Sequence, residues 1–165
     1  PRERRRLLQA SLVVSVRQRL TELGIALPDV PAPLAAYVPA VTSDGWIYTA
    51  GQLPLRDGTP LAVGIVGADV TPEVAAECAR QCAVNAVAAI ASVADLDEVE
   101  RIVKVTGFVA SAPDFTAQPI VVNGASEFLG DVFQDAGVHA RSAVGVAALP
   151  LGVPVEVEVI ARLRG

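Results

Sequence analysis

Apolar side chains recur at the spacing of an amphipathic helix in three parts of the chain. Near the amino terminus this spacing continues up to Gly24, a residue type that commonly follows a helix end. The apolar positions there are Leu8, Leu12, Val16, Leu20 and Leu23. They predict an N-terminal helix, and the proline-rich stretch 27–39 that follows predicts an extended linker to the rest of the chain.

The second helical pattern begins with a clear start signal. Thr71 can cap the helix, Pro72 suits the first helical position and Glu73 suits the positive end of the helix dipole. The expected buried stripe consists of Val74, Cys78, Cys82, Ala86, Ala89, Ile90 and Val93. The third pattern covers 119–137 and is expected to stop at Gly137. Its apolar face consists of Leu129, Val132, Phe133 and Ala136.

Shorter β-branched or alternating runs predict the strands. A Ser-Asp-Gly turn separates two apolar runs and indicates a hairpin. The expected strand segments are 37–41, 46–55, 102–110, 141–149 and 153–163. The order is helix, hairpin, helix, strand, helix, strand, strand. It predicts an α+β domain in which two long helices pack on one face of a mixed sheet.

Composition limits the possible functions. A chain of 165 residues is expected to form one domain, and a net charge of −5 argues against nucleic-acid binding. No apolar run is long enough to span a membrane. Cys78 and Cys82 are expected to be reduced core residues, because residues four apart on a helix are too distant for a disulfide. Reduced thiols favour a cytoplasmic protein. A metal pair is the weaker alternative, since the single histidine, His139, is distant in sequence.

The last two predicted strands carry the candidate chemistry. Glu156 and Glu158 share one face of the final strand, and Arg141 begins the preceding one. Arg141 can be a solvated strand end, a buried ion-pair partner or a clamp for an anion. Its planar fork matches a carboxylate. We expect Glu156 to lie on the strand adjacent to Arg141, within reach of such a ligand as an acid–base group, while Glu158 is as readily a solvent-facing residue.

Several segments together resemble the RidA family, also called YjgF/YER057c/UK114. They are "YVPAV", "WIYTAGQLPL", "CAVNAVAAI", "DLDEVERIVKVTGFVAS" and "ARSAVGVAALPLGVPVEVEVIA", in the family's order. The resemblance covers roughly Pro33 to Leu163, so we expect an N-terminal helix and linker over 1–32 and a RidA-like domain over 33–165. It implies a chorismate-mutase-like fold with a six-stranded sheet and two helices. It also implies a homotrimer with ligand sites in clefts between subunits.

The resemblance also implies roles for individual residues. Arg141 matches the arginine that binds the substrate carboxylate, and Glu156 the glutamate that positions the hydrolytic water. The further positions expected at the ligand are Tyr37, Gly51, Asn123 and Ala143. Ala143 stands where the family typically has a cysteine. Alanine serves there if only the backbone orients water or substrate, whereas activity is in question if the family needs the thiol.

Two functions therefore compete. The first is metal-free and cofactor-free hydrolysis of reactive enamine or imine acids, such as 2-aminoacrylate, to 2-oxo acids and ammonia. The second is a non-catalytic trimer that binds a small carboxylate. Glu156 distinguishes them, because a binder needs only Arg141 whereas a hydrolase also needs a carboxylate to hold water. A ribonuclease, the third candidate, is disfavoured by the net charge of −5 and the lack of a His or Lys cluster.

Overall fold

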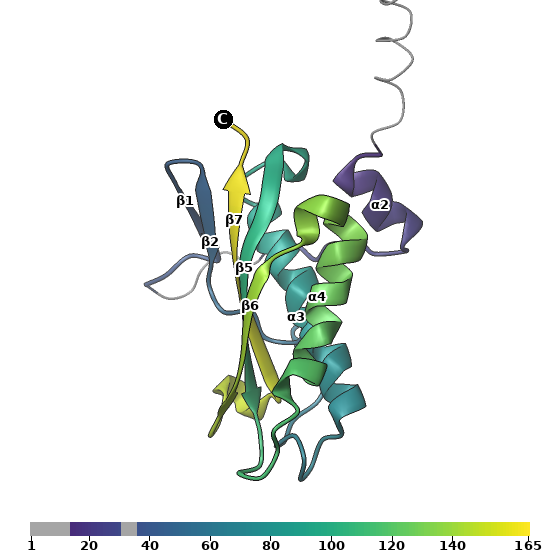
Figure 1. The fold of residues 1–165 in the computed structure, drawn as a ribbon, viewed down its shortest axis with the longest axis vertical. Coiled ribbons are helices and arrows are strands. Elements are labelled where there is room, and N and C mark those ends of the chain that lie inside the picture. Colours follow the sequence, from purple (N-terminus) through teal and green to yellow (C-terminus); the bar gives the residue numbers. More distant parts are fainter. Residues whose placement is uncertain (1–13, 31–35) are drawn as a thin grey trace, which may run out of the picture.

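The computed structural model describes residues 14–30 and 36–165, which form an α+β fold (Figure 1). The helices are α2 (Val16–Glu22), α3 (Pro72–Ala91) and α4 (Gln118–Phe133), with short 3-10 turns η1 (Leu96–Glu98), η2 (Gln134–Gly137) and η3 (Pro150–Gly152). The strands are β1 (Ala40–Ser43), β2 (Trp46–Thr49), β3 (Leu55–Arg56), β4 (Thr59–Pro60), β5 (Val99–Ala110), β6 (Ala140–Val146) and β7 (Val155–Leu163).

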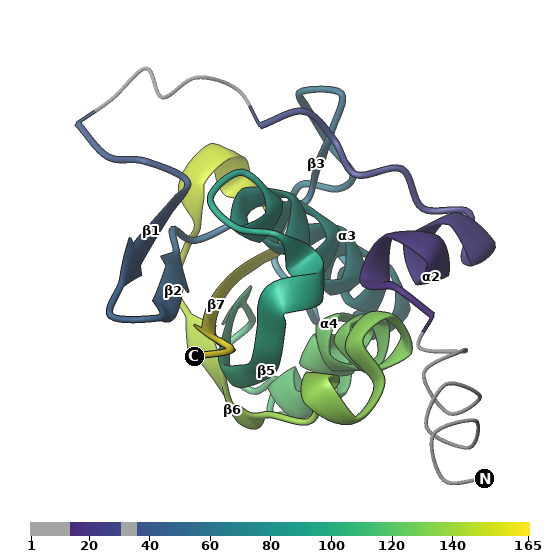
Figure 2. The same cartoon turned by 90° about the horizontal axis from the view of Figure 1, so that it is seen from above.

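The main sheet has the strand order β1-β2-β7-β5-β6. β5 pairs with β6 in parallel and with β7 antiparallel, so the sheet is mixed, as predicted. α3 and α4 lie side by side on one face, and no helix of the described chain covers the other (Figures 1 and 2). The resemblance implied six strands; the main sheet has five among the described residues, because β3 and β4 pair with each other in a separate small sheet.

Strand β7 shows how the sequence pattern builds the core. Its alternate residues face the helices with at most 1% of their surface exposed: Val155, Val157, Val159 and Ala161. The intervening Glu156, Glu158 and Ile160 are half-buried on the helix-free face. The period-two alternation therefore places apolar side chains in the core and both carboxylates outside it, as expected.

The two long helices agree with their sequence signals at most positions. The Thr71 hydroxyl accepts a hydrogen bond from the Val74 amide at 3.3 Å, which confirms the cap. Cys78 and Cys82 are fully buried and free, as predicted. Val74 and Val93 are 45% and 39% exposed, so their assignment to the buried stripe was wrong. Val74 lies in the first turn of α3 and Val93 follows its end, so the helical period no longer determines burial at these two positions.

The N-terminal helix is present in part. α2 begins at Val16 and ends at Glu22, while the predicted positions Leu8 and Leu12 lie outside the described residues. Val16 and Leu20 are buried, and the Val16 amide donates to the Asp97 carboxylate at 2.7 Å. Leu23 follows the helix and is 40% exposed, so its predicted place in the stripe was wrong.

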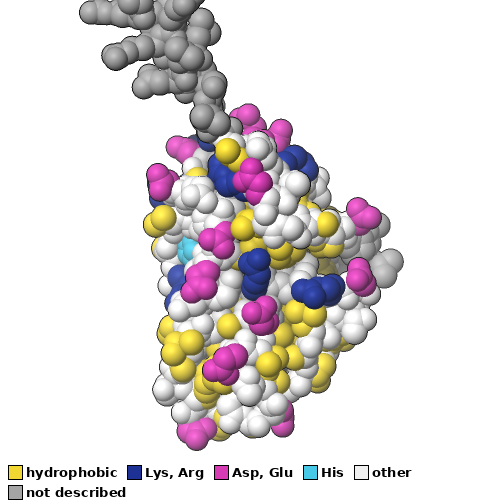
Figure 3. Space-filling model, turned by 90° about the vertical axis from the view of Figure 1, so that its right-hand side faces the viewer, with side chains coloured by type: hydrophobic (Ala, Val, Ile, Leu, Met, Phe, Trp, Pro, Cys, Tyr) yellow, Lys and Arg dark blue, Asp and Glu magenta, His cyan; other side chains and the backbone are white. Residues whose placement is uncertain are grey.

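The hairpin turn has the backbone that its residues favour. Asp44 and Gly45 have φ angles of 49° and 77°, the left-handed pair of a type I′ turn, and they join β1 to β2. Within the described chain, no helix combines the length and apolar character that crossing a bilayer requires. Basic and acidic side chains are interspersed over the helix-bearing face, without a continuous basic patch (Figure 3).

Candidate functional site

Arg141 lies near the start of the edge strand β6, and its side chain points toward α4. It pairs with the buried Val105, so it faces the helix side of the sheet. Its Nη1 donates to the Asn123 side-chain oxygen at 2.8 Å and to the Ser126 hydroxyl at 3.2 Å. Its Nη2 donates to the Pro119 carbonyl at 3.1 Å. All three acceptors are on α4, so this helix determines where the guanidinium lies.

These contacts leave part of the guanidinium available. All three acceptors are neutral, so they do not cancel the positive charge of Arg141. A guanidinium has five N–H donors, and both donors of Nη1 and one of Nη2 are occupied. Among the described residues, Nε makes no hydrogen bond and Nη2 makes only the one to Pro119. Nε and Nη2 form one edge of the planar group, the kind of edge that binds a carboxylate through two hydrogen bonds.

Glu156 lies on the opposite face, near the start of β7. Gly51 is held beside it by Gln52, whose backbone exchanges hydrogen bonds of 2.8 and 3.0 Å with Val157. A Cβ added at Gly51 would overlap the Glu156 carboxylate oxygen and lie 2.8 Å from its Cδ. Only glycine therefore permits this close approach. Gly51 and Glu156, both predicted at the ligand, are adjacent in the fold.

The environment of Glu156 changes its basicity. Partial burial, and secondly the negative charge of Glu158 on the same face, raise the pKa of the Glu156 carboxyl above its ordinary value. A carboxylate with a raised pKa is a stronger base.

The predicted adjacency of Arg141 and Glu156 was wrong. β5 lies between β6 and β7, and the two side chains point to opposite faces of the sheet. Strands that follow each other in sequence are not neighbours here, because β6 joins the sheet at its edge, in parallel with β5. In a single chain these two groups therefore do not face a common ligand.

The other candidate residues occupy two places. Asn123 contacts Arg141 directly, and Ala143 follows on the same face of β6, paired with Gly107. Tyr37 is 67% exposed just before β1, at the sheet edge opposite β6. One region thus contains Arg141, Asn123 and Ala143, and the helix-free face carries Glu156 beside Gly51.

Sequence reasoning missed two contacts of Arg141. Pro119 and Ser126 both contribute oxygen atoms to its guanidinium. The spacing of Asn123 and Ser126 was an available signal, because residues three apart on a helix share a face. His139 lies in the short loop between η2 and β6, and its ring contacts the Ser126 hydroxyl at 2.9 Å.

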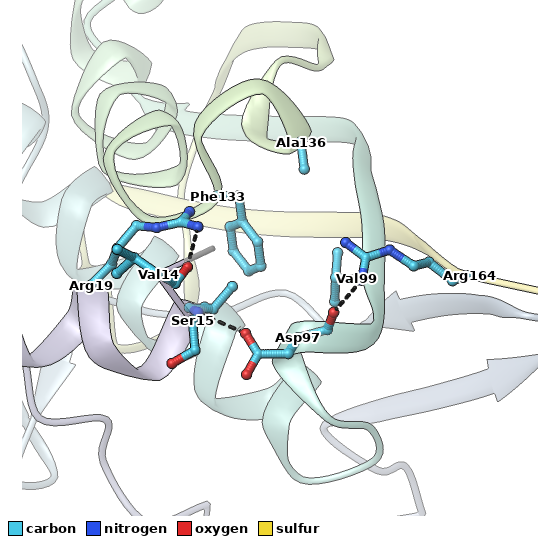
Figure 4. A pocket seen from close by; sticks show the side chains of 9 residues that line it. Val14, Ser15, Arg19, Asp97, Val99, Phe133, Ala136 and Arg164 are labelled. Atoms are coloured by element: carbon cyan, nitrogen blue, oxygen red, sulfur yellow. Dashed lines mark hydrogen bonds between the residues drawn. The ribbon is translucent and has the colours of Figure 1, made fainter. Parts of the chain in front are cut away.

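A separate cavity of about 280 Å³ lies between α2, η1 and the end of α4 (Figure 4). Arg19 donates there to the carbonyls of Val14 and Val132, and Arg164 donates to the carbonyl of Asp97. These arginines join segments distant in sequence and support the attachment of α2. None of the six candidate residues lines this cavity.

Comparison with known proteins identifies the family. The family model described as Endoribonuclease L-PSP matches residues 28–163. The chain belongs to this family, the YjgF/RidA family. Protein TCP17 of Trypanosoma cruzi is 43% identical over 151 residues, covering 90% of this chain and 94% of that protein. The 2-iminobutanoate/2-iminopropanoate deaminase of Escherichia coli is 39% identical over 141 residues, covering 85% and 97%.

Solved structures agree with this RidA assignment. The crystal structure of Atu1372, a protein of unknown function from Agrobacterium tumefaciens, is similar with a TM-score of 0.83 and 41% identity, covering 90% of this chain and 93% of that one. The recognised family and the α+β fold class are thus both confirmed.

Proposed function

We propose that this RidA family member is a metal-free hydrolytic deaminase of small enamine or imine acids. The observation that carries the proposal is the available Nε–Nη2 edge of Arg141, a charged group whose three protein contacts are all neutral. This edge suits the carboxylate of such a substrate. A relative 39% identical to this chain is named a 2-iminobutanoate/2-iminopropanoate deaminase, which supports the same substrate class.

In the proposed reaction, Arg141 binds the carboxylate and Glu156 holds the attacking water. The water oxygen bonds to the imine carbon while a water proton passes to the Glu156 carboxylate. Glu156 then delivers that proton to the nitrogen, which gives a carbinolamine. The carbinolamine hydroxyl passes its own proton through Glu156 to the amine as the carbon–oxygen double bond forms, so the carbon–nitrogen bond breaks and a 2-oxo acid and ammonia leave. The raised pKa of Glu156 favours its acceptance of the first proton.

The proposed site forms between copies of the chain. Because Arg141 and Glu156 face opposite sides of one sheet, the two roles require an Arg141 and a Glu156 from neighbouring subunits. The helix-free face supports such association through apolar side chains that its register aligns: Val41, Tyr48, Phe108, Val144 and Ile160. Val41, Tyr48 and Val144 are 48%, 43% and 43% exposed in the single chain. We propose that the protein is a homotrimer located in the cytoplasm. Light scattering tests the trimer.

The decisive experiment measures imine lifetime. An L-amino-acid oxidase generates imine acids in the presence of semicarbazide, which traps them before spontaneous hydrolysis. We expect the protein to lower the yield of trapped semicarbazone. A yield that stays unchanged for several imine acids would contradict the deaminase and leave the alternative, a non-catalytic carboxylate-binding trimer. Calorimetry with 2-oxobutanoate would then test that alternative directly.

A further inference from the structure

A chain of hydrogen bonds continues from Arg141 into the protein. The Ser126 hydroxyl accepts from Arg141 Nη1 at 3.2 Å and lies 2.9 Å from His139 Nε2. On the other side of the ring, His139 Nδ1 lies 2.6 Å from the Gly137 carbonyl oxygen. Ser126 is in the middle of α4, whereas His139 lies between η2 and β6. The chain therefore links the helix to the segment that leads into the strand of Arg141.

The chemistry of each group fixes the direction of these bonds. A carbonyl oxygen can only accept, so His139 Nδ1 carries a hydrogen and donates to Gly137. In the neutral ring Nε2 is then an acceptor, and the Ser126 hydroxyl donates its hydrogen to it. The lone pairs of the Ser126 oxygen can then accept hydrogen bonds from other groups, and Arg141 Nη1 donates one of them.

We propose that His139, acting through Ser126, is a positioning residue that orients the Arg141 guanidinium for its ligand. With the hydroxyl hydrogen held by His139, the Ser126 oxygen presents an acceptor to Nη1. Asn123 takes the other Nη1 donor, and Pro119 takes one from Nη2. Together these acceptors fix the guanidinium plane and keep the Nε–Nη2 edge available. The identity of the ligand, a small 2-oxo or 2-imino acid, rests on the proposed function.

The test compares two variants of equal shape. Ser126→Thr keeps the hydroxyl and Ser126→Val replaces it with a methyl group, while both are β-branched and impose similar constraints on α4. We expect Ser126→Val to bind 2-oxobutanoate about tenfold more weakly than Ser126→Thr, as for loss of one hydrogen bond to a charged group. In the deaminase assay KM should rise by a similar factor with kcat nearly unchanged, because Ser126 does not contact the reacting atoms.

A second substitution tests whether His139 acts through Ser126. His139→Phe should weaken binding about tenfold alone, yet cause little further loss when combined with Ser126→Val. Independent structural roles would instead give additive losses. Thermal unfolding of each variant identifies any general loss of folding.

Nuclear magnetic resonance reads the ring directly, because His139 is the single histidine of the chain. At a pH where the ring is neutral, its ¹⁵N spectrum should show the Nδ1–H tautomer. Adding 2-oxobutanoate should move the Nε2 signal in the wild type and much less in Ser126→Val. An Nε2–H tautomer, or equal affinities of the Thr and Val variants, would overturn the positioning role while leaving the deaminase proposal intact. A wild type that binds no 2-oxobutanoate would overturn the proposed function and the ligand assigned here.

Discussion

The two faces of the central sheet are made by the same strands but have different chemistry. The helix-bearing face is closed by α3 and α4 and is almost entirely apolar, with Arg141 only at its edge. The helix-free face mixes apolar side chains with Glu156 and Glu158. On the first face the chain alone supplies nearly every contact. The second has no helix over it among the described residues, and the proposed function places Glu156 there.

The largest expected effect distinguishes the two carboxylates of the helix-free face. Glu156→Gln should lower the deamination rate about 10²- to 10⁴-fold, as expected for loss of a positioned acid–base group. Glu158→Gln is the comparison, since Glu158 lies two residues further on the same face but is not beside Gly51. It should change the rate much less, only through its effect on the pKa of Glu156. Semicarbazide trapping measures both. Equal rates for the wild type and Glu156→Gln would remove Glu156 from the mechanism.

Two phenylalanines, one on each face, test whether the faces contribute differently to folding and to association. Phe128 on α4 is fully buried, and Phe128→Ala should lower the free energy of unfolding by about 3–5 kcal/mol. Phe108, opposite Glu156 on β5, is half-buried in the single chain. Phe108→Ala should lower the free energy of unfolding by less than half as much, but it should weaken the association of subunits. Urea unfolding and light scattering over a range of concentrations separate the two effects. If both variants lost the same free energy of unfolding and Phe108→Ala associated as well as the wild type, the proposed difference between the two faces would be contradicted.

Gly51 tests the close approach to Glu156. Its φ is not in the left-handed region, so the backbone tolerates alanine, but the new Cβ would displace the carboxylate. Gly51→Ala should lower the rate about a hundredfold, the scale of effect of an ångström-sized misplacement. Gly130→Ala is the control, because a Cβ there meets nothing within 4 Å. Unchanged kinetics of Gly51→Ala would show that the position of Glu156 is not critical.

Arg141 tests the edge of the helix-bearing face. Arg141→Lys keeps the charge but loses the planar fork. We expect the affinity for 2-oxobutanoate to fall about tenfold to a hundredfold, the range for one charge-assisted hydrogen bond. Arg101→Lys serves as control, since Arg101 is exposed and donates to the Val138 carbonyl. Calorimetry with equal affinities for the wild type and Arg141→Lys would contradict the clamp.

The smallest effect concerns stability and pH. The folded state raises the pKa of Glu156 above its usual 4.5, so it binds the proton more tightly than the unfolded chain. This contribution to stability is fully present below pH 4.5 and is lost as the pH rises through the folded-state pKa. Relative to wild type, Glu156→Gln should therefore gain stability as the pH rises through that window. Urea unfolding at several pH values measures the difference in unfolding free energy between Glu156→Gln and the wild type. A difference that does not change with pH would contradict this prediction.

Local chemistry made much of the fold predictable. The Thr71 cap, the Asp44–Gly45 turn and the alternation along β7 all depend on residues close in sequence, and all three are confirmed. The strand order could not be obtained in this way, because insertion of β5 between β6 and β7 depends on pairing across long separations. This is why Arg141 and Glu156 were wrongly placed on adjacent strands.

The candidate site shows the same limit. Arg141 and Asn123 could be selected from sequence by their resemblance to family positions, and the structure brings these two side chains into contact. The Ser126–His139 contact depends on how α4 docks beside the segment that precedes β6. No residue next to Ser126 or His139 in the sequence indicates that these two side chains meet. The roles of the candidate residues in binding and catalysis remain predictions.

The place of β7 in the sheet has a consequence for synthesis of the protein. β2 pairs with β7, the strand that follows all others in the described sheet, and β7 in turn pairs with β5. While the ribosome is still making the chain, the β1–β2 hairpin can form locally but cannot join the other strands. The sheet becomes continuous only when residues 155–163 have left the ribosomal tunnel. A ribosome stalled before β7 would therefore expose two unpaired sheet edges, those of β2 and β5, to aggregation.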